Sequence, residues 1–244
     1  MGKRTLIIGH RGAAGEAPEN TLASFRTAVT QGADAVELDI HLSADGEIVV
    51  CHDPTVDRTT DGAGSIALLT VAELKGLDAG SWFDPRYASE KLPLLEEVLA
   101  LVPAGIMINI EVKCRYSIRL EKRLRQLLAT YRRQDGVVVS SFDHKALARL
   151  KQAAPSLRIG LLYAADFRRH SLIATSFGSE VYSLHPDHRW LGDEDIADAM
   201  RAGLRVYPYT VNGKAEWDAL IAAEVSGIIT DYPGRLRAVR DRAL

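Results

Sequence analysis

The chain has 244 residues, of which 47% are hydrophobic and 25% charged, and its formal net charge is −2. This length matches the roughly 250 residues of a single (β/α)8 barrel, and the apolar fraction is sufficient for one large buried core. A net charge near zero, with basic residues spread along the chain, argues against a nucleic-acid partner and against an anionic membrane surface.

The N-terminal region is a short basic stretch followed by an apolar run of about five residues. Such a run is too short for the apolar region of a signal peptide and far too short to span a membrane. We therefore expect a cytoplasmic protein with no stable membrane association. The two cysteines, Cys51 and Cys114, lack the spacing of a metal site, and we expect both to be small side chains buried on strands.

Apolar, β-branched runs alternate with amphipathic segments along the chain, a pattern typical of parallel strands with helices between them. The runs that we predict as parallel strands span residues 5–9, 35–40, 106–112, 137–141, 158–163, 180–184, 204–211 and 227–230. Helical spacing predicts helices over 21–29, 94–102, 118–131, 144–153, 193–202, 214–223 and 233–242, while 167–177 is less regular. Asn20 is expected to cap the first helix. Eight parallel strands indicate the α/β class and a single (β/α)8 TIM barrel over residues 1–244.

A ninth apolar run, residues 47–52, does not fit this count. It follows Asp39 too closely for a helical crossover, which needs a dozen or more residues, and the intervening Asp45-Gly46 is a hairpin signal. We therefore predict an antiparallel return strand. A turn centred between Asp45 and Gly46 would place Asp39 opposite His52.

Residues 54–92 follow this hairpin and are interrupted repeatedly by glycine and proline. A connection of this length without structure is uncommon inside a barrel, so we predict a small insertion after the second strand, with a short helix over 71–77. Because the segment leaves the barrel at the strand ends, we expect it to be a subdomain that caps the mouth. Trp82 and Phe83 either line the entrance or pack within the insertion.

Charged residues collect where the early strands are predicted to end. They are His10-Arg11, Glu37, Asp39, His52-Asp53, Glu111 and Lys113. The interior of a parallel strand is apolar, so these side chains indicate one polar site at the carboxyl-terminal end of the barrel.

Three carboxylates dominate this predicted site. Side chains alternate along a strand, so Glu37 and Asp39 project to one side, as do Glu111 and Lys113. Carboxylates that converge repel one another unless a cation holds them, and hard oxygen ligands favour Mg²⁺ or Ca²⁺. Glu37, Asp39 and Glu111 are therefore the expected ligands of a divalent metal cofactor. The alternative is a cluster of ion pairs with Arg11 and Lys113.

The remaining charged residues suit phosphoryl chemistry. An unperturbed imidazole pKa near 6.5 lets His10 and His52 transfer protons at neutral pH, one as base and the other as acid. Arg11 offers a planar fork to phosphate oxygens, and Lys113 adds a compact positive charge.

Together these motifs, with Pro18-Glu19-Asn20-Thr21, Ser140-Ser141-Phe142, Thr210-Val211-Asn212 and Thr230-Asp231, resemble the glycerophosphodiester phosphodiesterase family across nearly the whole chain. The soluble cytoplasmic bacterial members are the most similar in layout. The resemblance implies a (β/α)8 barrel with an insertion after the second strand, and hydrolysis of glycerophosphodiesters to sn-glycerol 3-phosphate and an alcohol. It also implies that Glu37, Asp39 and Glu111 bind Mg²⁺ or Ca²⁺ and that His10 and His52 are the acid and base.

Other candidates depend on weaker signals. Phe142 and Trp217 are candidates for contact with the glycerol or leaving group, although Trp217 also suits a packed helix. His185, at the end of a predicted strand, and Tyr209, where the family often has an aromatic residue, are further candidates for substrate binding. We expect the remaining histidines at the surface; they are His41, His144, His170 and His188.

Two other functions fit parts of the pattern. A phospholipase D-like or phosphoinositide-cleaving enzyme would act on lipid phosphodiesters, but it needs an apolar rim of which Trp82 and Phe83 are the main trace. A non-catalytic phosphate-metabolite binding protein would be expected to lack one of the histidines or acids. The preferred alcohol, the oligomeric state, the choice between water attack and a cyclic phosphate intermediate, and the division of roles between the histidines stay open.

Overall fold

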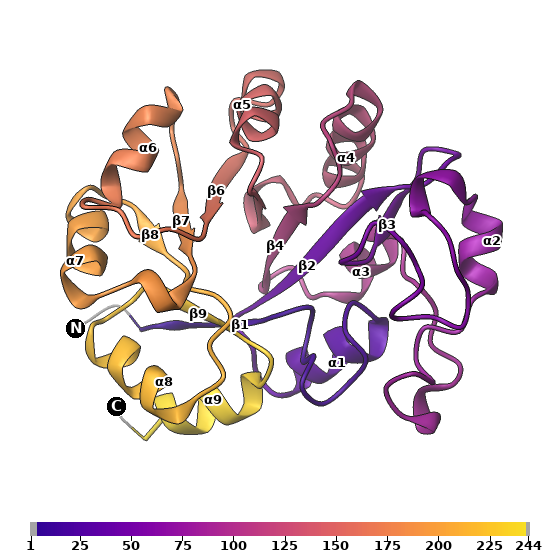
Figure 1. Ribbon diagram of the computed structural model, residues 1–244, viewed down its shortest axis with the longest axis horizontal. Coiled ribbons are helices and arrows are strands. Elements are labelled where there is room, and N and C mark those ends of the chain that lie inside the picture. Colours follow the sequence, from indigo (N-terminus) through magenta and orange to yellow (C-terminus); the bar gives the residue numbers. More distant parts are fainter. Residues whose placement is uncertain (1–3, 243–244) are drawn as a thin grey trace.

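Eight parallel strands curl into a nearly closed barrel in the computed structural model, which describes residues 4–242 (Figure 1). The strands are hydrogen-bonded in the order β8-β7-β6-β5-β4-β2-β1-β9. They are β1 (Leu6–Gly9), β2 (Ala35–Leu42), β4 (Met107–Val112), β5 (Val137–Ser141), β6 (Arg158–Tyr163), β7 (Ser183–Pro186), β8 (Arg205–Val206) and β9 (Gly227–Thr230). The two edges approach where Ile229 N donates to Pro208 O at 3.0 Å and Val211 N donates to Ile229 O at 2.9 Å. The predicted TIM barrel is confirmed.

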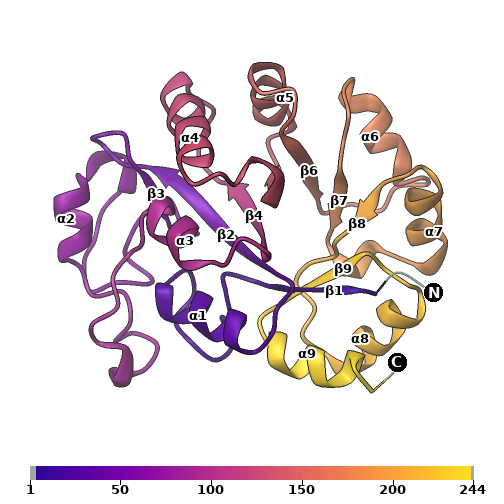
Figure 2. The same ribbon diagram turned by 180° about the vertical axis from the view of Figure 1, so that it is seen from behind.

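The helices surround the strands in chain order, as the two opposite views show (Figures 1 and 2). They are α1 (Leu22–Thr30), α2 (Val71–Gly76), α3 (Leu95–Leu101), α4 (Ile118–Thr130), α5 (His144–Ala153), α6 (Ser171–Phe177), α7 (Asp193–Arg201), α8 (Lys214–Ala222) and α9 (Pro233–Arg240). Short 3-10 turns occur at Ile66–Leu68, Pro85–Tyr87, Gln134–Gly136 and His188–Trp190. Within residues 4–242, none of these helices has the length and apolar character needed to cross a membrane.

The strand interiors explain why the polar site lies at one end of the barrel. Ile8, Ala35 and Ile229, on β1, β2 and β9, form a small apolar cluster with Tyr207, which directly follows β8. Side chains alternate along a strand, so the residue two positions further along each strand projects to the same side, closer to the carboxyl-terminal end. Those residues are His10, Glu37, Tyr209 and Asp231. The apolar cluster is thus followed directly by a polar layer.

The start of α1 differs from the prediction. Thr21 is the N-cap, and its Oγ1 accepts a hydrogen bond from Ser24 N at 3.3 Å. Asn20 has a left-handed φ of 57° and donates from Nδ2 to Asp39 Oδ2 at 2.9 Å. The N-cap prediction for Asn20 is wrong because its amide binds a carboxylate of the barrel instead of the helix terminus.

The hairpin after β2 is antiparallel as predicted, but its register is different. Strand β3 (Ile48–Val50) pairs Ile40 with Val50, so Asp39 lies opposite Cys51, whose N donates to Asp39 O at 3.0 Å. The predicted pairing of Asp39 with His52 is wrong by one position. The loop has three residues rather than two, with Gly46 at a φ of 93°, a conformation that glycine adopts without strain.

The segment between β3 and α3 packs with Val49 of β3 into a small apolar cluster. Its buried members are Val49, Cys51, Val56, Ile66, Leu74, Ala79 and Leu92. The predicted short helix is confirmed as α2, which lies at the edge of the molecule outside the other helices (Figures 1 and 2). Trp82 contacts Phe83 edge-on at 5.7 Å, and its Nε1 donates to Ala79 O at 2.9 Å, so the pair packs within the segment. A capping role for residues 54–92 stays a prediction.

Candidate active site

Three buried carboxylates meet where the middle of β2, with Glu37 and Asp39, lies beside the carboxyl-terminal end of β4, with Glu111. The two strands are adjacent and parallel, and their register places Asp39 beside Glu111. One oxygen from each of Glu37, Asp39 and Glu111 lies within 4.8 Å of the others, an arrangement that can hold a metal ion. The structure therefore brings together the three acids that the strand pattern singled out.

The three buried carboxyl groups differ in pKa. Burial and the charges of Asp39 and Glu111 raise the pKa of Glu37 well above its usual range. Burial and Asp39 likewise raise the pKa of Glu111 to about 7. Burial also opposes ionisation of Asp39, but Arg11 and Lys113 overcome this effect and lower its pKa. Without a further cation, Asp39 is therefore the acid of the trio that ionises most readily.

Two cations lie against these acids. Lys113 Nζ is 2.6 Å from Glu111 Oε1 and 3.4 Å from Asp39 Oδ1. Arg11 Nε is 3.3 Å from Asp39 Oδ2, while the backbone N of Arg11 donates to Glu37 Oε2 at 2.9 Å. Arg11 has a left-handed φ of 49°, strained for a residue with a side chain, which aims both its N–H and its guanidinium at the acids.

The ion pairs leave part of the cluster unsatisfied. Among residues 4–242, Glu37 Oε1 is buried without a hydrogen-bond partner. A buried carboxylate oxygen without a partner costs free energy, and three acids exceed the two cations that touch them. An oxygen-only set with a free carboxylate atom fits a hard divalent cation. The donor set therefore favours a metal site over ion pairing alone.

His10 is held by the carboxylate of Asp231, the residue directly after β9. Its Nδ1 is 2.6 Å from Asp231 Oδ1. Asp231 is held in turn by Asn212, whose Nδ2 donates to Asp231 Oδ2 at 2.6 Å and whose Oδ1 accepts from Asp231 N at 2.9 Å. A carboxylate that accepts from Nδ1 leaves Nε2 of the ring as the atom for proton transfer.

His52 has the same kind of partner from another part of the chain. Its Nδ1 is 2.6 Å from Oδ1 of the following residue, Asp53. Burial lowers the pKa of His52, and the positive charge of Arg11 acts in the same direction, although Asp39 and Asp53 oppose the shift. The ring is therefore predominantly neutral at pH 7 and able to accept a proton.

The weaker candidates are placed differently. Phe142 is 51% exposed and contacts Tyr209 edge-on with ring centroids 6.0 Å apart, so both face the carboxyl-terminal side of the barrel. Tyr209 Oη donates to Tyr163 O at 3.1 Å. Trp217 is only 4% exposed and its Nε1 donates to Val211 O at 2.8 Å. This side chain packs in the apolar core beneath α8, and its contact with substrate stays a prediction.

His185 lies inside the barrel wall and is fully buried. Its Nε2 is 2.8 Å from Ser183 Oγ, and burial lowers the pKa of the ring to about 3. Gly160 on the adjacent strand provides the room, since a Cβ there would lie 2.4 Å from Nε2. The structure places His185 as a neutral interior residue, and its contact with substrate stays a prediction.

Several residues that bind groups of the site were not assigned a role in it from the sequence. They are Asn20, Asp53, Arg58, Asn212 and Asp231. The surface expectation was also wrong for His41, which is 6% exposed and contacts His52 O through Nε2 at 3.0 Å, and for His170, which is fully buried. Each of the two aspartates had one usable signal in the sequence. Asp53 directly follows the candidate histidine His52, and Asp231 directly follows the last predicted strand.

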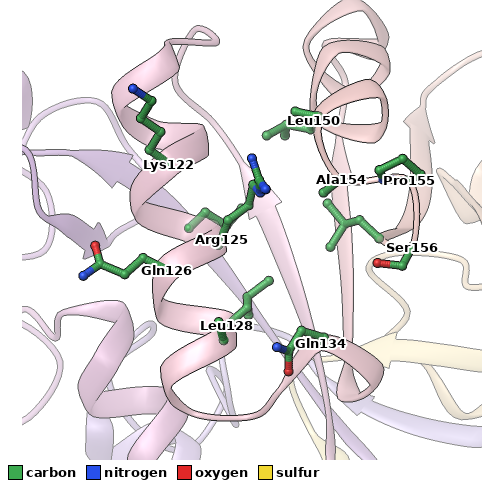
Figure 3. A pocket seen from close by; sticks show the side chains of 13 residues that line it. Lys122, Arg125, Gln126, Leu128, Gln134, Leu150, Ala154, Pro155 and Ser156 are labelled. Atoms are coloured by element: carbon green, nitrogen blue, oxygen red, sulfur yellow. The ribbon is translucent and has the colours of Figure 1, made fainter.

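A cavity of about 560 Å³ lies away from this site, between α4 and α5 (Figure 3). Leu128 and Leu150 contribute apolar surface to it, while Lys122 and Arg125 extend from α4 beside it. It contains none of the candidate catalytic residues. Its lining is that of a gap between neighbouring helices, so the reactive groups at the strand ends define the candidate active site.

Comparison with known proteins identifies the family. The model of the glycerophosphoryl diester phosphodiesterase family matches residues 10–235, and the chain belongs to this family. A glycerophosphodiester phosphodiesterase of Caldanaerobacter subterraneus subsp. tengcongensis is 40% identical over 236 residues, with 96% of each chain covered. One from Bacillus subtilis is 34% identical, covering 97% of this chain and 87% of the relative.

Solved structures agree with the sequence relatives. An Oleispira antarctica phosphodiesterase in complex with the product sn-glycerol-3-phosphate superposes with a TM-score of 0.90 at 31% identity, covering 98% of this chain and 97% of that one. A glycerophosphodiester phosphodiesterase from Thermotoga maritima has a TM-score of 0.77 at 26% identity, covering 97% and 98%. The protein is a glycerophosphodiester phosphodiesterase, a phosphoric diester hydrolase.

Proposed function

We propose that the enzyme hydrolyses glycerophosphodiesters to sn-glycerol 3-phosphate and an alcohol, with a divalent cation, Mg²⁺ or Ca²⁺, held by Glu37, Asp39 and Glu111. The observation that carries this proposal is the pair of histidines beside the acidic trio, each with Nδ1 bound to a carboxylate. The product found in the Oleispira antarctica relative supports the same substrate class.

Charge complementarity supports the binding of a phosphodiester. When bound, the cation would neutralise charge on the phosphoryl oxygens. Arg11 and Lys113 both touch Asp39, so their positive charges border the same space and stabilise the charge that grows on the phosphoryl group. The ion pairs with the buried acids keep the side chains of Arg11 and Lys113 at the site instead of extended into solvent.

His10 and His52 supply the proton transfers. Each ring is oriented through Nδ1 by a carboxylate, so Nε2 of one ring takes a proton from the attacking oxygen and Nε2 of the other donates one to the departing alkoxide. Burial and Arg11 keep His52 neutral at neutral pH. His10 retains its Asp231 partner in a more enclosed position, with 18% of its side chain exposed.

A glycerol 3-phosphate release assay tests this proposal. We expect EDTA treatment to abolish release from glycerophosphocholine and glycerophosphoethanolamine, and added Mg²⁺ or Ca²⁺ to restore it. His10→Ala and His52→Ala should each lower kcat by about 10²- to 10⁴-fold. Full activity of metal-free protein would disprove the metal site, and near-wild-type activity of both variants would disprove the histidine assignment. Faster turnover of lysophospholipid vesicles than of soluble diesters would instead favour the lipid-cleaving alternative.

A further inference from the structure

Arg58 lies outside the barrel, in the segment between β3 and α3, and binds two carboxylates of the site. Its Nε donates to Asp53 Oδ2 at 2.7 Å and its Nη2 donates to Asp53 Oδ1 at 3.2 Å. Its Nη1 and Nη2 each donate to Glu19, both at 2.8 Å. Both carboxylates have a second partner: Asp53 binds His52, and Glu19 accepts from Arg11 Nη1 at 2.7 Å.

We propose that Arg58 is a positioning residue for hydrolysis: by bridging Asp53 and Glu19, it holds the His52 ring in a set relation to Arg11 and the carboxylate trio. The inference rests on the proposed role of His52 as acid or base. Arg58 would not touch the reacting atoms, and its effect would pass through Asp53.

The course of the backbone explains why His52 needs this support. The hydrogen bonds between β2 and β3 end at Cys51, so His52 lies beyond the paired part of the hairpin. Its ring orientation depends on Asp53, the next residue along the same loop. A carboxylate on a loop fixes a ring only if the carboxylate is itself fixed, and a rigid guanidinium fork provides that restraint.

The other histidine shows the same design with a different residue. Asp231, which binds His10, is held by Asn212 through two hydrogen bonds. Arg58 occupies the equivalent place for Asp53, and it also anchors Asp53 to Glu19 in the loop between β1 and α1. Each histidine therefore has a carboxylate, and each carboxylate has its own anchor.

Partial exposure argues that geometry, not global stability, is what Arg58 contributes. Its side chain is 45% exposed, and ion pairs at exposed positions add little to folding stability. Hydrogen bonding from Arg58 is the main cause that lowers the pKa of Asp53 far below its usual range. Asp53 consequently stays an anion at neutral pH and can accept a hydrogen bond from Nδ1 of His52.

The test compares steady-state release of glycerol 3-phosphate by wild type, Arg58→Ala, Arg58→Lys and Arg86→Ala. Arg86 serves as the matched control: it is an arginine of the same segment whose guanidinium pairs with Asp84 and lies over the Tyr87 ring, away from Asp53 and Glu19. We expect Arg58→Ala to lower kcat by about 10²-fold with KM nearly unchanged, because the ring is misplaced rather than the substrate lost. Arg58→Lys should lie between, since an ammonium keeps the charge but lacks the fork. Adding Arg58→Ala to Asp53→Asn should cause little further loss.

Other outcomes overturn the proposal. They are a wild-type kcat for Arg58→Ala, a loss confined to KM, and full activity of Arg58→Lys. Circular dichroism measures whether each variant is folded. If Arg58→Ala is unfolded, the kcat of Arg58→Lys alone tests the proposal, and a wild-type kcat for that variant refutes it. His52→Ala in the same assay separates the two hypotheses: a fully active His52→Ala refutes the proposed role of His52, whereas an inactive His52→Ala beside a fully active Arg58→Ala refutes only the role of Arg58.

Discussion

Replacement of Asp231 with asparagine is the sharpest test of the His10 geometry, because the neighbours dictate how the new amide must lie. Asn212 Nδ2 donates to Asp231 Oδ2, so the oxygen of an asparagine at position 231 would keep that contact. Its NH2 group would then face Nδ1 of His10, 2.6 Å from the present Oδ1. Two donors cannot share this contact, so the ring must carry its hydrogen on Nε2 instead.

The magnitude follows from this exchange of tautomers. Restoring the productive tautomer would leave two donors facing each other, which costs about 1–3 kcal/mol for the lost hydrogen bond. The variant also loses the carboxylate charge that stabilises the ring once it is protonated. In a serine protease triad the same exchange lowers kcat about 10⁴-fold. We expect Asp231→Asn to lower kcat by about 10³- to 10⁴-fold.

Release of glycerol 3-phosphate at saturating substrate and metal measures this effect. Asp166→Asn is the matched control, because Asp166 is an exposed aspartate in the loop after β6. Thermal unfolding should be little changed, since aspartate and asparagine have the same shape and the bond between residue 231 N and Asn212 Oδ1 is retained. An Asp231→Asn variant with wild-type kcat would refute the tautomer argument.

Two pH responses complete the predictions. Because the pKa of Glu111 is raised to about 7, protons compete with the metal for this carboxylate near neutral pH. Calorimetric titration with Mg²⁺ or Ca²⁺ should therefore show a metal affinity that falls by up to about tenfold per pH unit below 7. A constant affinity from pH 8 to 6 would contradict the metal site. Burial lowers the pKa of His185 to about 3, so between pH 6.5 and 3 the unfolded chain binds a proton that the folded chain excludes. Urea unfolding should therefore show a loss of about 2 kcal/mol from this residue between pH 7 and 5, which His185→Gln removes; an equal loss in both proteins would contradict this explanation.

The barrel and the acidic trio were predictable because both arise from regular strand physics. Parallel strands buried on both faces appear as continuous apolar runs, and their ends gather at one edge whatever the details of packing. Glu37, Asp39 and Glu111 could therefore be grouped from alternation and strand order alone. Strand ends were less certain: β8 covers only Arg205–Val206, because Pro208 has no N–H to donate and the pairing beyond it is reduced to an isolated bridge between Asp187 and Tyr209.

The anchoring residues could not be derived in this way. Asn212 and Asp231 are 19 residues apart, and Arg58 reaches Glu19 across 39 residues. Neither separation matches the repeat of a helix or a strand, and polar residues are common in loops, so the sequence pattern does not single these residues out. Their partners are set by where the loops return to the barrel, which is a tertiary outcome. Asn20 shows the same limit, since its local signal for a helix cap lost to a long-range contact with Asp39.

A shift of one residue in the register of the hairpin determines which groups hold His52 in place. Asp-Gly is compatible with a two-residue turn, which would pair Asp39 with His52 and let backbone hydrogen bonds hold that histidine. The three-residue loop with Gly46 at positive φ moves Cys51 into that position and leaves His52 beyond the ladder. His10 is thus held by its backbone bond to Thr230 O and by Asp231, directly after β9. The ring of His52 is held instead by Asp53, which Arg58 of the following segment anchors. Changes within residues 54–92 should therefore reach the chemistry through His52, and changes near β9 should reach it through His10.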